Sequence, residues 1–266
     1  MSIRALKRDG AEQSPSRDGF TLLELAVVVG IIGILAALLL PALSTAKSRA
    51  QGAACRNNLR QVGLALAAYV SDSHRYPPMW GVIGGSFATW ADKLTADGRW
   101  SWTNRSWHCP SYLSQNGLIQ FRPPPKQVIF HGSYAYNGYG IAGLEGSPQL
   151  GLGVLPRSAA PDPEVQAPSE LYTVADSRTF RDIPIGGEGI VPGLSGGIHM
   201  DPYHAFKEET PPLHRVGYNI LFADGHVALV KRSNYLYPPR TAQHWNRDNQ
   251  PHPEAWAPRN EWVIQQ

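Results

Sequence analysis

Residues 19–24 read GFTLLE, and residues 25–40 continue as the uncharged apolar run LAVVVGIIGILAALLL. Glu24 is the only charged residue within residues 22–40. A helix over this stretch would be about 28 Å long, which is close to the hydrocarbon thickness of a bilayer. An acidic side chain inside such a segment is unfavourable unless a partner meets it. The stretch therefore predicts a membrane-spanning helix over about 22–40 that carries one functional carboxylate.

The residues before this run are polar, and Gly19 stands at the junction with Phe20. This arrangement resembles the N-terminus of type IV prepilins and type II secretion pseudopilins. The resemblance implies that residues 1–19 are a leader, cut between Gly19 and Phe20 by a prepilin peptidase, and that the new amine of Phe20 is methylated. It also implies that Glu24 acts in subunit assembly and that Pro41 bends the helix.

Composition narrows the class of partner. The 266-residue chain has a formal net charge of +3, charged residues make up 17% of it, and it contains 26 Gly and 23 Pro. Without a basic run, nucleic acid is not expected as a partner. Abundant Gly and Pro are typical of a loop-rich exported domain. Basic residues flank the apolar run on both sides, so the positive-inside rule does not decide its orientation.

Topology and partners therefore follow from the resemblance. It implies a single pass through the inner membrane, with the N-terminus in the cytoplasm and a periplasmic or extracellular head, and a place in a fibre after processing. The implied partners are the prepilin peptidase, other pilin or pseudopilin subunits in a helical homo- or hetero-assembly, an inner-membrane assembly platform and membrane lipid.

Helical periodicity continues beyond the membrane stretch, and one N-terminal helix is predicted for residues 20–76. Pro41 lacks a backbone N–H and should kink this helix without ending it. After Pro41, apolar residues recur at helical spacing and form one face, which should pack on a domain: Cys55, Leu59, Val62, Leu66 and Tyr69. The run Tyr76-Pro77-Pro78 should end the helix.

Residues 77–231 read as a β-rich globular head and residues 232–266 as a polar tail. Strands are expected at 127–130, 133–136 and 171–175, and long loops between them. The clearest strand signal is at 218–222 and 227–230, around Asp224-Gly225, which predicts a two-residue type I′ turn with Phe222 opposite Val227. The expected fold is α+β and pilin-like: a long kinked N-terminal helix, its first half transmembrane, packed on a small antiparallel β-sheet.

His214 precedes Asp224-Gly225 by nine intervening residues. Together with CRNNLRQ at 55–61, CPS at 109–111 and SYAYN at 133–137, this spacing resembles a large prepilin-like family with a C-terminal H-x9-DG motif. A straight strand would hold His214 roughly 30 Å from Asp224, so one metal ion could not bind both. The motif is predicted to be structural, with Asp224 and Gly225 forming the turn and His214 fixing the other end of the hairpin.

Two further sets of residues have alternative roles. Asp176 and Asp224 each follow an apolar strand; if the strand ends meet, their carboxylates could bind Ca²⁺, and otherwise they are turn residues. Cys55 and Cys109 would form a disulfide in an oxidising compartment, whereas Cys55 on the apolar helix face also suits a buried free thiol. No other metal or cofactor is expected.

The function predicted from these observations is a structural subunit of a type IV pilus or type II secretion pseudopilus, and not an enzyme. The alternative is a membrane-anchored extracytoplasmic module that binds a glycan or a protein. Five Trp residues within 80–107 suit core packing better than sugar stacking. A metal-dependent hydrolase would need converging acids or histidines, and His226, His244 and His252 lack zinc-ligand spacing.

Overall fold

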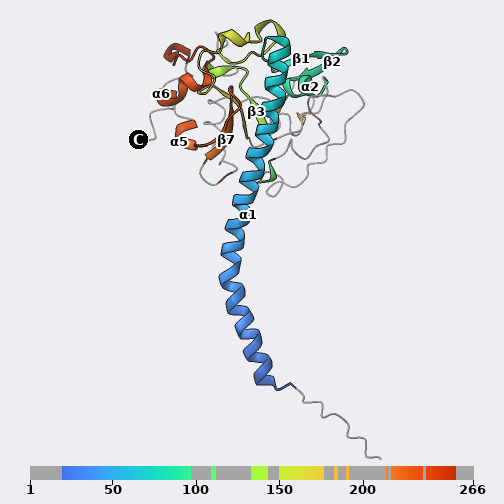
Figure 1. Cartoon of the computed structure of the whole chain (residues 1–266), viewed down its shortest axis with the longest axis vertical. Coiled ribbons are helices and arrows are strands. Elements are labelled where there is room, and N and C mark those ends of the chain that lie inside the picture. The colour runs from blue at the N-terminus through green and yellow to red at the C-terminus, as the bar shows by residue number, and fades with distance from the viewer. Residues whose placement is uncertain are drawn as a thin grey trace, which may run out of the picture. The chain divides into compact units, whose positions relative to one another are not determined.

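A computed structural model describes residues 20–96, 109–111, 133–142, 150–176, 183–184, 190–191, 214, 217–235 and 238–255. The chain divides into two compact units, Met1–Ala46 and Lys47–Gln266 (Figure 1). The leader with Gly19, the expected strand at 127–130, and Trp100, Trp102 and Trp107 lie outside the described residues.

The predicted N-terminal helix is confirmed as α1 (Leu22–Ser73), which continues through Pro41. One turn after the proline, the Thr45 hydroxyl donates a hydrogen bond to the Pro41 carbonyl at 3.0 Å. A bend at Pro41 remains a prediction. In the first unit, the apolar side chains of α1 are exposed, and among the described residues α1 is the helix long and apolar enough to cross a membrane.

In the second unit, α1 presents the predicted apolar face to the head. Cys55, Leu59, Val62 and Leu66 are buried there, and Tyr69 packs against the same core. The helix lies close to the sheet at Gly63, where an added Cβ would lie 2.8 Å from Leu221 Cδ1. The helix ends just before His74, which has a positive φ of 55°.

The head is built on a four-stranded antiparallel sheet, which confirms the α+β class. Its strands lie in the order β3-β4-β7-β8. Two of the predicted strands appear as β3 (Tyr134–Tyr136) and β4 (Tyr172–Asp176), and the hairpin as β7 (Gly217–Phe222) and β8 (Val227–Lys231). Two small hairpins accompany this sheet: β1 (Trp80–Ile83) with β2 (Ser86–Thr89), and β5 (Ile183–Pro184) with β6 (Ile190–Val191).

Two hydrophobic clusters fill the head, and strand alternation separates them. Tyr134, Tyr136 and Leu221 belong to the cluster with α1, whereas Ala135 and Ile220 belong to the other. Trp90, which begins α2 (Trp90–Ala96), is fully buried in the first cluster and stacks on Tyr136 with ring centroids 5.1 Å apart. Core packing is thus confirmed for this Trp.

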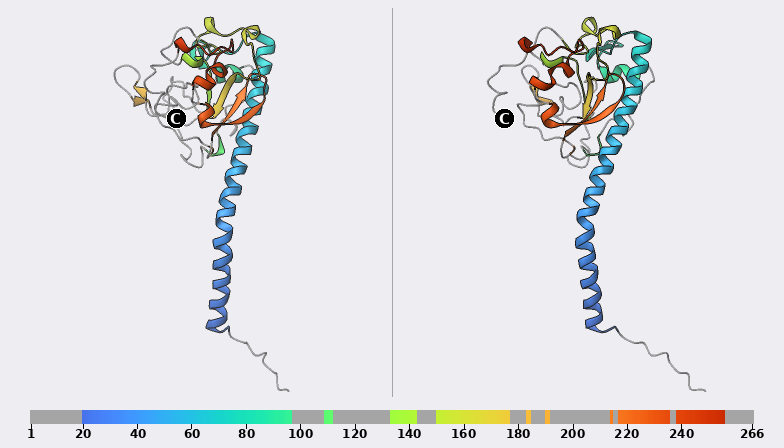
Figure 2. Two further views of the ribbon diagram at one scale, coloured as in Figure 1. Left: turned by 90° about the vertical axis from the view of Figure 1, so that its left-hand side faces the viewer. Right: turned by 60° about the vertical axis from the view of Figure 1, so that its left-hand side comes forward.

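The predicted polar tail is wrong for the residues up to Ala255. The segment forms α5 (Arg232–Tyr235), α6 (Pro238–Thr241) and the 3₁₀ helices η5 (Ala242–Trp245) and η6 (Pro253–Ala255). Tyr235, Ala242 and Trp245 are buried in the second cluster. Figure 2 shows the sheet with α1 on one side and these C-terminal helices on the other. The sequence did not predict these short helices because the apolar residues of the segment are few and lie between Pro, Arg and Asn.

The hairpin turn differs from the prediction by one residue. Leu221 pairs with Val227, and the N–H of Phe222 donates to the His226 carbonyl at 2.9 Å, so Phe222 lies opposite His226. The loop therefore has three residues, with Gly225 at φ 89° as the last of them. A type I turn followed by a left-handed Gly is the usual three-residue connection, and only that Gly needs positive φ.

Candidate functional site

The start of α1 is closed by a reciprocal pair of side chains. The Thr21 backbone N–H and hydroxyl donate to Glu24 Oε2 at 2.9 and 2.8 Å, and the Glu24 N–H donates to Thr21 Oγ1 at 3.2 Å. This is a capping box, in which both residues satisfy backbone donors that the first helical turn leaves free. Sequence reasoning assigned Glu24 a role between subunits and missed this role within the chain, although the T-x-x-E spacing indicates it.

The register of the sheet contradicts the hypothesis that Asp176 and Asp224 bind one Ca²⁺ ion together. Strands β4 and β7 are antiparallel, with Tyr172 opposite Phe222 and Ala175 opposite Ile220. The C-terminal ends of the two strands therefore lie at opposite ends of the sheet. Asp176, the last residue of β4, is fully buried beside Asn219, whereas Asp224 lies in the exposed turn after β7. Their carboxylates do not converge.

His214 lies at the end of the hairpin away from the turn. It forms an isolated bridge with Gly217, whose N–H donates to the His214 carbonyl at 2.8 Å. The antiparallel register brings the end of β4 to this same place. The His214 side chain therefore reaches Asp176, with Nε2 2.9 Å from Oδ2.

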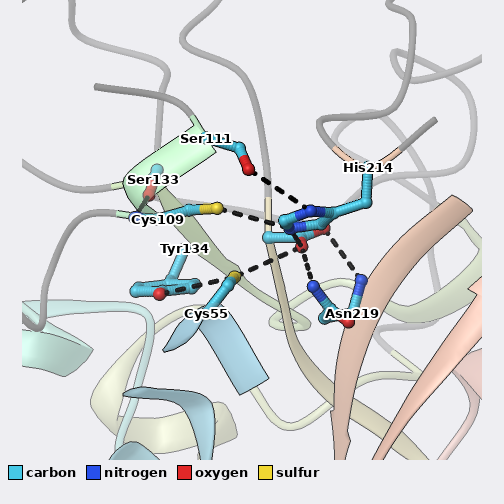
Figure 3. Close-up of polar contacts among 8 residues, drawn as sticks. Cys55, Cys109, Ser111, Ser133, Tyr134, His214 and Asn219 are labelled. Carbon is cyan, nitrogen blue, oxygen red and sulfur yellow. Dashed lines mark hydrogen bonds and ion pairs between the residues drawn. The ribbon is translucent and has the colours of Figure 1, made fainter. Parts of the chain in front are cut away.

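Two thiols complete what we call the buried cluster: Cys55, Cys109, Asp176 and His214. Cys55 comes from α1 and lies 3.4 Å from Asp176 Oδ2, measured from Sγ. Cys109 Sγ lies 3.3 Å from His214 Nε2. The four ligand-type atoms are all within 4.8 Å of one another, and all four residues are buried (Figure 3).

Neighbouring polar groups hold the members of the cluster in place. Asn219 donates to both carboxylate oxygens of Asp176, from its backbone N–H at 3.0 Å and from its side-chain amide at 2.8 Å. Ser111 Oγ lies 3.4 Å from the second ring nitrogen of His214, Nδ1. The Tyr134 hydroxyl donates to Cys55 Sγ at 3.6 Å, and the Cys109 N–H donates to Ser133 Oγ. Figure 3 shows the side chains of Cys55, Cys109 and His214 pointing toward one another.

The proximity of the four groups shifts their protonation equilibria. Hydrogen bonds from Cys55 and His214 outweigh burial and lower the pKa of Cys109 to about 6. Burial alone would lower the pKa of His214, but its hydrogen bonds to Asp176 and Cys109 raise it to about 10. Burial, together with the neighbouring Cys109 and Asp176, raises the pKa of Cys55. The cluster therefore brings together, in one buried place, a thiol with a lowered pKa and an imidazole with a raised pKa.

Of the two alternatives for the cysteines, the structure has buried free thiols at Cys55 and Cys109 and not a disulfide. Sequence reasoning quoted the fragments around Cys55, Cys109 and His214 separately and placed Asp176 in a different hypothetical site. The four residues are far apart in the sequence and show no local ligand spacing. The usable signal was that Cys55, Cys109 and His214 each lie in a short motif of the same resembled family.

Comparisons with known proteins agree with the N-terminal observations. A family model described as the prokaryotic N-terminal methylation motif matches residues 15–40, which include the capping box and the whole apolar run of residues 25–40. The chain is prepilin-like. A second family model, described as a protein of unknown function (DUF1559), matches residues 45–120 of this prepilin-like chain.

Several curated relatives share part of the sequence. The type IV major pilin protein PilA of Myxococcus xanthus is 37% identical over 71 residues, which are 27% of this chain and 32% of the relative. Type II secretion system core protein G of Pseudomonas aeruginosa is 37% identical over 65 residues, 24% of this chain and 46% of the relative. Core protein G of Escherichia coli K12 is 42% identical over 59 residues, 22% of this chain and 41% of the relative. The chain thus spans less than half the length of these relatives, and no solved structure matches it.

Proposed function

We propose that this protein is a structural subunit of a type IV pilus or type II secretion pseudopilus. The observation that carries the proposal is the first part of α1, where a long apolar surface begins at a capped acidic residue. Its side chains are exposed, with Leu22 87% and Leu38 70% accessible. A continuous apolar surface of this kind is stable only against lipid or against other apolar helices.

A pilin-like subunit would meet lipid first, as a precursor, and the apolar helices of other subunits later, in the fibre. The precursor would lie in the inner membrane with its N-terminus in the cytoplasm and its head outside. After a prepilin peptidase cuts before Phe20 and the new amine is methylated, the helix would leave lipid and pack against the helices of other subunits. An inner-membrane platform would organise this step, and Glu24 would pair with a cation of the neighbouring subunit.

The capping box is compatible with processing because it lies entirely after the predicted cut. Thr21 and Glu24 remain in the mature chain, so the first turn of α1 stays capped whether or not the leader is present. The carboxylate then has a partner in its own chain while the subunit is in the membrane. Assembly would add a positively charged partner to a residue that is already ordered.

Fractionation of cells that produce the full chain tests the proposal. Fibres are sheared from the surface or pelleted from the periplasm, and the head is detected by antibody in the fibre and membrane fractions. A pilin-like subunit should appear in the fibre fraction with a mature N-terminus at Phe20, measured by mass spectrometry. Recovery only in membranes would instead support the alternative, an anchored binding module.

A further inference from the structure

The buried cluster has a composition that the proposed function does not use. Two thiols, one carboxylate and one imidazole come from α1, from the segment at 109–111, from the end of β4 and from the residue that bridges to β7. Cys55, Cys109 and Asp176 are fully buried, and His214 is 9% exposed. We propose that this cluster binds one Zn²⁺ ion as a closed structural site that joins α1 to the sheet.

The two sulfur atoms, one nitrogen and one oxygen of the cluster are the kinds of ligand atom that favour zinc. Zinc is bound in proteins by thiolate sulfur, imidazole nitrogen and carboxylate oxygen, and structural zinc sites are four-coordinate. Ca²⁺ and Mg²⁺ take oxygen ligands, which excludes them from a site with two sulfurs and a nitrogen. Four protein ligands fill a tetrahedral shell, so no position remains for a substrate, and the site is structural and not catalytic.

Three of the six distances between the ligand atoms are close to those of a tetrahedral zinc site. Zn–S bonds of about 2.3 Å and Zn–N or Zn–O bonds of about 2.0 Å require ligand edges of about 3.5 Å between sulfur and a lighter atom, and about 3.3 Å between nitrogen and oxygen. The cluster has edges of 3.4 Å from Cys55 to Asp176, 3.3 Å from Cys109 to His214 and 2.9 Å from His214 to Asp176. All six distances lie within 4.8 Å, so rotations of the side chains would complete the tetrahedron around the ion.

Two of the proposed ligands have polar neighbours outside the cluster, as metal ligands in proteins usually do. His214 presents Nε2 to the cluster while Nδ1 faces Ser111 Oγ at 3.4 Å. Asp176 receives two hydrogen bonds from Asn219, which fix its carboxylate plane. Partners of this kind orient metal ligands and raise their affinity for the ion. Zinc binds thiolate sulfur and neutral imidazole nitrogen, so binding would release the protons that these groups hold.

Native mass spectrometry of the purified full chain in detergent provides the first test. We expect a mass gain of one zinc ion less the protons it displaces, removed by a strong chelator at low pH and restored by added Zn²⁺. Co²⁺ in its place should give the visible absorption of a tetrahedral site and a thiolate-to-metal charge-transfer band. A mass lower by two hydrogens with no metal would show a Cys55–Cys109 disulfide and overturn the proposal, as would two reduced thiols with no metal.

Substitutions locate the ion. Asp176→Asn keeps the shape of the side chain and removes its charge, and Cys109→Ser replaces the sulfur ligand by an oxygen. Each should weaken zinc binding by more than the roughly 10–100-fold that loss of a hydrogen-bond partner of a ligand causes. The matched control is His226→Ala, which removes an exposed imidazole of the turn and should leave zinc binding unchanged.

If the variants do not fold, the unmutated chain can still test the proposal, by comparing its Tm with and without a chelator. Removal of the ion should lower Tm, and added Zn²⁺ should raise Tm with its concentration, because the ion binds the folded chain. Equal zinc affinity in Asp176→Asn, Cys109→Ser and the unmutated chain would contradict the proposal. So would a Tm of the unmutated chain that does not respond to chelator or zinc. Neither result depends on whether the protein enters a fibre.

Discussion

Thr21 and Glu24 cap the first turn of α1 for each other, with the Thr21 hydroxyl 2.8 Å from Glu24 Oε2 and the Glu24 N–H 3.2 Å from Thr21 Oγ1. The carboxylate therefore has a local role that any test of its role between subunits must separate. The two roles depend on different residues. Capping needs both Thr21 and Glu24, whereas pairing with a cation of a neighbouring subunit needs only Glu24.

We expect Glu24→Val to leave cleavage before Phe20 intact and to reduce incorporation into fibres strongly. The matched control is Thr21→Val, which breaks the cap but keeps the charge and should incorporate well. Both variants are followed by shearing and immunoblotting. If the two variants incorporate equally poorly, the acid acts through the cap and the inter-subunit role is wrong.

Processing should depend on the small residue before the cut. Gly19 leaves the peptide bond accessible to a tight protease site, so Gly19→Leu should accumulate uncut precursor in the membrane. The adjacent Asp18→Asn, which changes charge and not bulk, should be cut normally. The precursor and mature forms are resolved by mass spectrometry, and normal cutting of Gly19→Leu would contradict a prepilin-type cleavage.

The hairpin turn should depend on Gly225 through backbone strain alone. Its φ is 89°, and an added Cβ would meet nothing within 4 Å. Gly225→Val should therefore lower the free energy of unfolding by about 1–3 kcal/mol. Gly225→Asn should cost less, because Asn adopts positive φ more readily than β-branched residues do. Denaturant unfolding measures both, and equal losses would mean that strain is not the cause.

The C-terminal segment should make stability depend on pH through His252. Its Nε2 lies 2.7 Å from Asp248 Oδ2 and its Nδ1 lies 2.7 Å from Glu254 Oε1. Partial burial would lower the pKa of His252, but the hydrogen bonds to the two carboxylates outweigh it and raise the pKa above its ordinary value. A raised pKa means that the folded state holds the proton more tightly than the unfolded state does.

The stabilising contribution of His252 is therefore fully present below about pH 6.5, the unfolded value, and is lost as the pH rises through the folded pKa. His252→Gln should flatten the dependence of Tm on pH in that window. His226→Gln serves as a control that leaves the His252 contacts in place. An unchanged pH profile in His252→Gln would contradict this assignment.

Local patterns predicted the parts of the fold that depend on neighbouring residues. The apolar face of α1 and strands β3, β4, β7 and β8 follow from periodicity and turn residues within short windows. The turn was off by one residue because Asp-Gly serves both two-residue and three-residue loops, and only the pairing of Phe222 with His226 distinguishes them. The buried cluster was missed for a different reason: it depends on the antiparallel register of β4 and β7, which brings Asp176 to His214.

The central position of β7 has a consequence for how the chain acquires its structure. The buried face of α1 starts at Gly52 and packs on Leu221, so the first helix of the head stays uncovered until β7, which lies much later in the sequence, has been made. Such non-local pairing closes large loops and folds slowly. Until β7 arrives, the Cys55–Val70 face is open to wrong partners and to oxidation, as expected for exposed apolar surface in a partly made chain. Cells that produce this protein should therefore degrade heads that are truncated before β7.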